Sequence, residues 1–109
     1  YYNKSVSNIE GLKMASTPSY SRNNHWMSVL QIDKNIYGKD REGLMSYLSK
    51  NQIQTRPAWA LIHNQKPYLK SQSYNIALAQ DLVDKSLCLP SSTNLKDIDL
   101  EKIIHALKN

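Results

Sequence analysis

The sequence predicts an α+β domain in which a small antiparallel or mixed sheet of three to four short strands packs against about three helices. Short apolar segments of strand length alternate with segments whose apolar residues recur every three or four positions. The chain has 109 residues, which is the size of one ordinary domain and not of two. Three Gly, four Pro and 40% hydrophobic residues exclude a disordered, collagen-like or low-complexity chain.

The first third of the chain is expected to hold two strands. Residues 1–5 are expected to be the last turns of a helix, and a short strand follows at 12–15. A polar loop over 16–24 precedes a central strand at 25–32, whose apolar residues lie on both faces. Residues 33–38 are expected to form a loop.

One amphipathic helix is predicted next. Asp40 is expected to cap a helix that runs to about Lys50, because Asp side chains accept hydrogen bonds from the first free backbone N–H groups. Leu44 and Leu48 lie one turn apart on its core face. Asn51 is expected to end the helix in the left-handed conformation.

A short strand, a long loop and two further helices complete the expected order. The strand covers 53–56 and is stopped by Pro57, and a loop-rich segment extends to residue 73. A helix is expected over 74–85, and a buried strand over 87–89. The last helix begins near Asp97 or Asp99, and its apolar stripe follows helical spacing at Leu100, Ile103, Ile104 and Leu107.

The charge balance favours a solvated basic surface. The chain has 14 Lys and Arg against 9 Asp and Glu, which gives a net charge of +5. The eleven lysines are dispersed, and no basic run with interleaved aromatic residues occurs. We therefore expect no nucleic-acid partner. Nucleic-acid binding is kept as a third hypothesis, which requires an affinity that falls steeply with salt.

The compartment is expected to be the cytoplasm. Cys88 is the only cysteine, so no internal disulfide can form, and its leucine neighbours favour inert burial. No apolar run approaches the roughly 20 residues that a membrane span needs, and no signal segment opens the chain. Because the chain begins at Tyr1 without Met, in sequence that is already helical, we expect a piece of a longer protein.

No self-sufficient active site is predicted. The sequence has no glycine-rich phosphate loop, no nucleophile elbow and no zinc-binding His-Glu-x-x-His motif. His25, His63 and His105 are far apart, and Cys88 has no partner at a metal-ligand spacing. We expect neither a bound metal nor a complete catalytic group.

The segment 52–68 concentrates residues that contact ligands. Arg56 offers a planar fork for a carboxylate or phosphate, Trp59 a flat face for a sugar or base, and His63 a switchable donor. Such groups are commonly placed on a loop that follows a strand. The alternative is a surface loop pinned by one buried tryptophan, and the spacing alone does not decide between the two.

Three stretches taken together resemble one family. They are NHWMSVL at 24–30, IQTRPAWALIH at 53–63 and LPSS at 89–92. Their order and separations resemble the C-terminal region of the DegT/StrS-type nucleotide-sugar aminotransferases, which are pyridoxal-phosphate enzymes of fold type I. The Thr-Arg-Pro-x-Trp version is similar to the branch in bacterial surface-sugar pathways, including legionaminic-acid-like ones.

The resemblance implies that residues 1–109 are a single domain, the C-terminal small domain of a longer enzyme. In that family the large domain holds the Schiff-base lysine, and none of the eleven lysines here matches its motif. The parent enzyme would bind pyridoxal phosphate and this chain would not. It would transfer an amino group, usually from glutamate, to a keto sugar on a nucleotide, and would be a homodimer. This chain alone would be inactive.

The resemblance also implies which residues line the substrate side. Trp26 and the loop from Arg56 to His63 would close over the nucleotide sugar. Arg56 would meet the diphosphate or the donor's carboxylate, Trp59 would pack on the sugar, and His63 would hydrogen-bond to it. Trp26 is equally well explained as a core residue. The alternative function is a stand-alone small-ligand or protein-binding module that uses the Trp59 and His63 loop.

Overall fold

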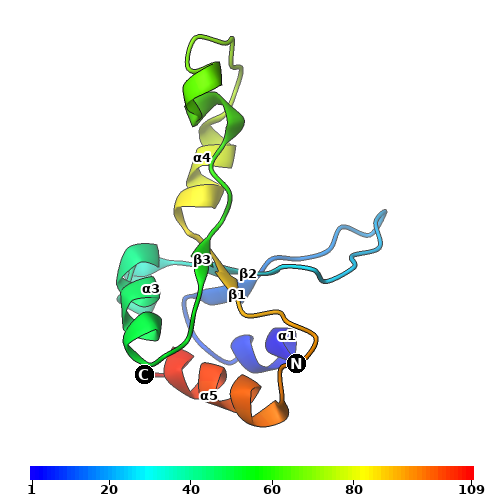
Figure 1. Ribbon diagram of the computed structural model, residues 1–109, viewed down its shortest axis with the longest axis vertical. Coiled ribbons are helices and arrows are strands. Elements are labelled where there is room, and N and C mark those ends of the chain that lie inside the picture. Colours follow the sequence, from blue (N-terminus) through cyan, green and yellow to red (C-terminus); the bar gives the residue numbers. More distant parts are fainter.

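The computed structural model describes residues 1–109, which form a four-stranded sheet with helices beneath it and a long arm that stands away from it (Figure 1). None of the helices has the length and apolarity that a membrane crossing requires. Two 3-10 turns, η1 and η2, lie in the arm. The elements are α1 Tyr2–Val6, β1 Leu12–Met14, β2 Ser28–Ile32, α2 Lys34–Tyr37, α3 Arg41–Lys50, β3 Arg56–Pro57, η1 Ile62–Asn64, η2 Lys66–Tyr68, α4 Ala77–Asp84, β4 Ser86–Leu89 and α5 Asp97–Leu107.

The sheet is antiparallel throughout, in the order β1-β2-β4-β3. The α+β class and the number of strands are confirmed, and β2 lies inside the sheet as a central strand. Leu30 of β2 pairs with Leu87 of β4, and both side chains are fully buried. The next pair, Val29 with Cys88, points to the other face because side chains alternate along a strand.

The core lies on one face of the sheet. It joins the strands to α1, α3 and α5, of which α1 and α5 lie together beneath the sheet in Figure 1. Leu44 and Leu48 of α3, and Ile103, Ile104 and Leu107 of α5, are buried in this core, as their helical spacing predicted. The fully buried large side chains are Val6, Leu30, Leu44, Leu48, Leu87 and Leu107. A shared core of this kind gives the chain a hydrophobic interior of its own.

The predicted N-cap of α3 is confirmed, but the predicted left-handed residue at its C-terminal end is wrong. The Asp40 side chain accepts a hydrogen bond from the Gly43 N–H at 2.8 Å, which confirms the N-cap. The left-handed residue is not Asn51, whose φ is −89°, but Gln52, whose φ is 62°. The Asn51 N–H still bonds to the Tyr47 carbonyl, so the chain reverses one residue later than predicted.

Residues 33–38 contain the short helix α2 and not only the predicted loop. The Asp33 side chain caps its first turn by accepting from the Asn35 N–H at 3.0 Å. Gly38 ends it with a φ of 82°, a conformation that glycine adopts without steric cost. The N-cap Asp33 and the C-terminal Gly38 are both typical helix-end residues. Only four residues lie between them, which is too few for the apolar periodicity of a helix to be recognised in the sequence.

Two strand boundaries also differ from the prediction. β2 begins at Ser28 and not at residue 25, because His25 has a φ of 55°, outside the extended region. β3 covers Arg56–Pro57, so Pro57 lies within the strand that it was expected to stop. β3 is an edge strand, where a proline without an N–H group breaks no ladder hydrogen bond.

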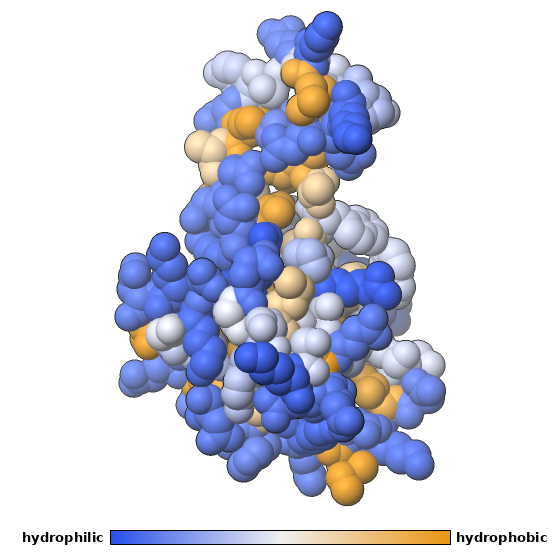
Figure 2. All heavy atoms as spheres, turned by 60° about the vertical axis from the view of Figure 1, so that its left-hand side comes forward, coloured by the Kyte–Doolittle hydropathy of each residue, from blue (hydrophilic) through white to orange (hydrophobic).

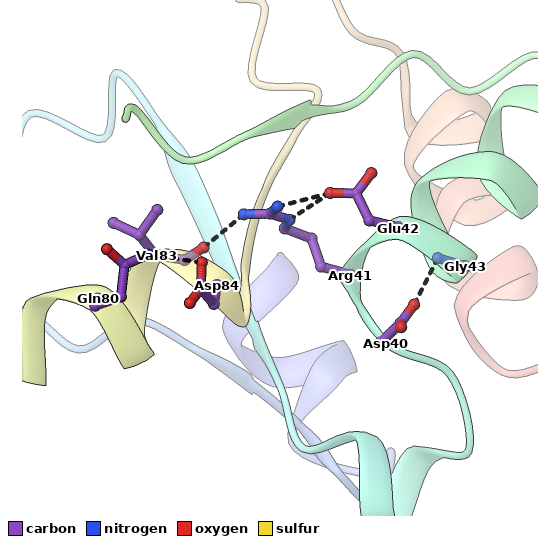
Figure 3. Close-up of polar contacts among 7 residues, drawn as sticks. All are labelled: Asp40, Arg41, Glu42, Gly43, Gln80, Val83 and Asp84. Carbon is purple, nitrogen blue, oxygen red and sulfur yellow. Dashed lines mark hydrogen bonds and ion pairs between the residues drawn. The ribbon is translucent and has the colours of Figure 1, made fainter. Parts of the chain in front are cut away.

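The segment between β3 and β4, residues 58–85, is the arm. Its helix α4 is shorter than the predicted 74–85, and none of its residues is buried. The base of the arm is fastened to α3, since Arg41 Nη1 donates to the Val83 carbonyl at 3.0 Å while Nε and Nη2 donate to Glu42 Oε1 (Figure 3). The arm therefore starts from a fixed position, although no residue of its helix is fully buried.

Candidate functional site

Trp26 and Trp59, from two distant parts of the sequence, form an aromatic pair. Their ring centroids are 5.6 Å apart at an interplanar angle of 62°, which is an edge-to-face arrangement. Trp26 is 64% exposed and Trp59 71% exposed. Both the core interpretation of Trp26 and the alternative of a loop pinned by a buried Trp59 are therefore wrong.

The backbone of Trp26 is held from the third motif of the sequence. Ser91 Oγ donates to the Trp26 carbonyl at 2.8 Å. The Trp26 N–H donates to Asn24 Oδ1 at 3.1 Å, and the His25 N–H donates to Asn23 Oδ1 at 2.8 Å. Ser91, a residue of the LPSS motif, thus holds the backbone of the loop that carries Trp26. The two asparagines hold the left-handed bend at His25.

Arg56 lies on the edge strand, on the face of the sheet that the core does not cover. It pairs with Cys88, which pairs in turn with Val29, so the three residues form a row across three strands. The Arg56 side chain is exposed and makes no hydrogen bond or ion pair within the chain. It borders a groove of about 590 Å³ that also reaches Lys102 of α5.

His63 lies in η1 on the arm and is half-buried. The next residue, Asn64, donates from Nδ2 to Gln80 Oε1 at 2.9 Å and so ties η1 to α4. No hydrogen bond or ring contact joins His63 or Arg56 to the tryptophan pair. The structure therefore brings together two of the four predicted site residues, Trp26 and Trp59, and leaves the other two flanking them along the chain.

The arm exposes apolar side chains over its whole length. Figure 2 shows orange residues among the blue ones along the projecting part of the molecule. Such an exposed apolar surface is typical of an interaction site. The large apolar side chains involved are Trp59, Ile62, Tyr68, Leu69, Tyr74, Leu78 and Leu82, between 37% and 89% exposed.

Burial perturbs two groups near the motifs. Desolvation raises the pKa of the Cys88 thiol, so the side chain is a neutral thiol, as the prediction of inert burial requires. Desolvation, with a smaller contribution from Tyr1, raises the pKa of Tyr2 to about 12. The Tyr2 hydroxyl donates to the Pro90 carbonyl at 2.8 Å, which anchors the end of the LPSS segment to α1.

The lysines lie at or near the surface of the chain. None of them is buried, and the two that are half-buried have partners within the chain. Lys39 Nζ lies 5.4 Å from the ring centre of Tyr37 and 5.2 Å from that of Tyr47, and Lys85 forms an ion pair with Asp81. No three His, Cys, Asp or Glu side chains come together to hold a metal ion.

The model of the DegT/DnrJ/EryC1/StrS aminotransferase family matches residues 1–108. The chain belongs to this family. The matched range includes Trp26, the Arg56–His63 loop and Ser91, which come from the three motifs that carry the resemblance. The match covers the sheet, the arm and α5 without interruption.

Individual relatives agree with this assignment. EpsN of Bacillus subtilis strain 168, named as a candidate pyridoxal phosphate-dependent aminotransferase, is 22% identical over 97% of this chain. The structure is similar to DesI, solved with its TDP-sugar product, with a TM-score of 0.87 and 23% identity over 98% of the chain. It is also similar to the aminotransferase TlmJ from Streptoalloteichus hindustanus, with a TM-score of 0.82 and 20% identity over 98% of the chain. The chain spans 28% of the length of each.

Proposed function

We propose that this chain is the C-terminal small domain of a longer enzyme that transfers an amino group, usually from glutamate, to a keto sugar linked to a nucleotide. The family match supports the reaction class, and the chain's 28% share of its relatives supports a longer parent. Because of the Thr-Arg-Pro-x-Trp motif, we propose that the reaction belongs to the synthesis of bacterial surface-polysaccharide sugars. We propose that it takes place in the cytoplasm.

The Trp26–Trp59 pair is the observation that carries the assignment of a binding role. Two large aromatic rings that remain more than half exposed contribute little to the core, yet the backbone of Trp26 is held by the Ser91 hydrogen bond and Trp59 packs against the Trp26 ring. A flat apolar face of this kind packs against the C–H surface of a sugar ring or against a base. In our proposal Trp26 and Trp59 hold the sugar nucleotide while the reacting carbon faces the rest of the enzyme.

Arg56 and His63 are proposed to contact the polar groups of the substrates. The unpaired guanidinium of Arg56 suits the diphosphate or the donor's carboxylate, because its fork donates two parallel hydrogen bonds. His63 is half-buried on the arm and would hydrogen-bond to a sugar hydroxyl. Neither residue is assigned a proton-transfer step.

We propose that pyridoxal phosphate binds to a part of the longer enzyme that is not included in residues 1–109. Pyridoxal phosphate supplies the electron sink and the amino-group carrier of such transfers when it is bound through a lysine. Because no lysine of this chain has a buried, cofactor-sized surrounding, we propose that the chain alone has no aminotransferase activity. Its contribution is to bind and orient the substrate and to exclude water.

The exposed arm supports the proposal that the parent enzyme is a homodimer with extensive contacts to this domain. An arm whose helix buries no residue gains stability only when another surface covers it. In the parent enzyme, that surface would be the large domain or a second subunit.

Amination of a nucleotide keto sugar by the longer enzyme, with glutamate as donor, is the test of the proposed function. We expect the W59A variant to raise the KM for the nucleotide sugar, and the H105Q variant, altered at an exposed position on α5, to behave as the parent. Product is measured by mass spectrometry. Absence of any amination, or an unchanged KM in W59A, would contradict the proposal.

A stand-alone binding module is the second candidate, and the exposed apolar arm is the observation that favours it. Calorimetry of the isolated chain with a nucleotide sugar, without pyridoxal phosphate, distinguishes the two. A module of this kind binds on its own with an affinity in the micromolar range or better. A small domain that supplies one wall of a site binds far more weakly, because most contacts are missing.

A further inference from the structure

The ladder between β2 and β4 ends shortly before it reaches Trp26. Its outermost pair at this end is Ser28 with Leu89, and the residue that follows Leu89 is Pro90. Because proline has no N–H group, it cannot extend the ladder as a donor. The backbone groups of Trp26 lie beyond this point, so they need hydrogen-bond partners from outside the ladder.

A serine hydroxyl supplies one of these partners. The antiparallel register, continued by two positions beyond the last β2–β4 pair, sets Trp26 opposite Ser91. Ser91 Oγ donates to the Trp26 carbonyl at 2.8 Å, so a side chain takes the place of a backbone donor. The carbonyl of the intervening Pro90 accepts from the Tyr2 hydroxyl at 2.8 Å. The segment that carries Ser91 is therefore itself tied to α1.

Two asparagines hold the same backbone from the other side. Asn24 Oδ1 accepts from the Trp26 N–H at 3.1 Å, and Asn23 Oδ1 accepts from the His25 N–H at 2.8 Å. His25 has a φ of 55°, which residues other than glycine rarely adopt, and these local hydrogen bonds stabilise that conformation. Both backbone polar groups of Trp26 are thus bonded to side chains, one close in the sequence and one 65 positions away.

The position of the Trp26 ring depends on this frame. The ring is 64% exposed, and its aromatic partner Trp59 lies 5.6 Å away between ring centroids. A side chain with so little buried surface gains little free energy from packing, and this gain must offset the entropy lost when the ring takes a single orientation. Fixing the backbone on both sides of the residue reduces the number of orientations that the ring can reach.

We propose that Asn24 and Ser91 are positioning residues that hold the Trp26 ring against Trp59, in the orientation that receives a substrate ring. They act through Trp26 and not by contact with the substrate. The step from the ring pair to the substrate rests on the proposed function, whereas the hold on the ring pair does not. The Leu-Pro-Ser-Ser motif thereby acquires a defined role, since Pro90 ends the ladder and Ser91 replaces its next hydrogen bond.

Circular dichroism of the 109-residue chain tests the hold on the ring pair. Trp26 and Trp59 are the only tryptophans, so the exciton couplet between their indole bands, taken as the difference from the W59A spectrum, reports on this contact. We expect N24A and S91A each to lose at least half of the couplet. N24D and S91T keep the acceptor oxygen and the donor hydroxyl, and they should retain most of it. S92A is the matched control and should leave the couplet unchanged, because the hydrogen bond to Trp26 comes from the neighbouring serine.

Amide hydrogen exchange in the parent chain gives a measurement that needs no substitution. The Trp26 N–H should exchange several times more slowly than an unstructured amide, because it is bonded to Asn24. A freely exchanging Trp26 amide would overturn the proposal, and so would a full couplet in N24A and S91A. Equal losses in the conservative and the alanine variants would overturn it as well, since the hydrogen bonds would then not be what holds the ring. If the alanine variants do not fold, the exchange rate and the conservative variants decide.

Kinetics of the longer enzyme test the link to the substrate. We expect S91A to raise the KM for the nucleotide sugar about fivefold, the effect of losing one neutral hydrogen bond, and to leave kcat unchanged because the ring takes no part in the chemistry. S92A should behave as the parent. An unchanged KM in S91A beside a raised KM in W59A overturns the proposal. An unchanged KM in both variants contradicts the proposed function instead, and the couplet then decides the positioning role by itself.

Discussion

The Trp26–Trp59 contact can be measured by a double-mutant cycle on the isolated chain. The variants are W26A, W59A and the double variant, and the quantity compared is the free energy of unfolding in urea. If the two rings contact each other in solution as they do in the structure, the double substitution costs less than the sum of the single ones.

The structure sets the size of the expected effects. About a third of each ring is buried, since Trp26 is 64% and Trp59 71% exposed. A third of a tryptophan surface is roughly 80 Å², and at about 25 cal/mol per Å² each single substitution costs up to about 2 kcal/mol. The edge-to-face contact itself contributes about 0.5–1.5 kcal/mol, which is the coupling energy that the cycle isolates.

Circular dichroism follows the transition, because the fluorescence of the chain is lost with its tryptophans. A second cycle, W59A with I36A, serves as the control, since Ile36 is exposed on α2, whereas Trp59 lies in the arm. Its effects should add within about 0.5 kcal/mol. Additive effects in the Trp26–Trp59 cycle as well would show that the pair does not exist in the free chain, and would remove the main support for the binding role.

Three further predictions concern the core, the pH dependence and the arm. L48A removes most of a fully buried side chain on α3 and should lower the free energy of unfolding by about 2–5 kcal/mol in urea; a loss under 1 kcal/mol would contradict the described core. The pKa of Tyr2 is raised in the folded chain from 10.0 to about 12, so its contribution to stability is complete below pH 10 and is lost as the pH rises toward 12. The free energy of unfolding should therefore fall less between pH 10 and pH 12 in Y2F than in the parent chain, and equal losses over this range would refute the assignment. L78D on α4 should reduce self-association in sedimentation velocity, whereas I98D on α5, at a position of equal exposure, should not; equal effects would show that the arm is not the apolar contact surface.

Much of the secondary structure was predictable because its signals are local. The cap at Asp40, the spacing of Leu44 and Leu48, and the stripe on the last helix each depend on residues within one or two turns. Errors arose where two local signals compete. Gln52 takes the left-handed conformation that asparagine favours, and Pro57 remains in a strand because that strand lies at an edge.

The candidate site was predictable only in part. The residue types in the Arg56–His63 loop and the resemblance of three motifs pointed to binding, and the family was confirmed. No local pattern shows that Trp26 contacts Trp59, that Ser91 holds Trp26, or that Lys102 shares a groove with Arg56. These contacts join residues far apart in the chain, and they depend on the strand order β1-β2-β4-β3, which the apolar pattern does not encode.

By itself, the sequence determined the α+β class, most of the helices and the family, since these follow from local periodicity, capping and motif order. Only the tertiary structure decided which apolar residues are covered. The pattern of α4 is that of a helix with a packing face, yet none of its residues is buried in this chain. Periodicity records that a helix has an apolar side but not what lies against it, because burial depends on the surfaces that the rest of the fold brings near.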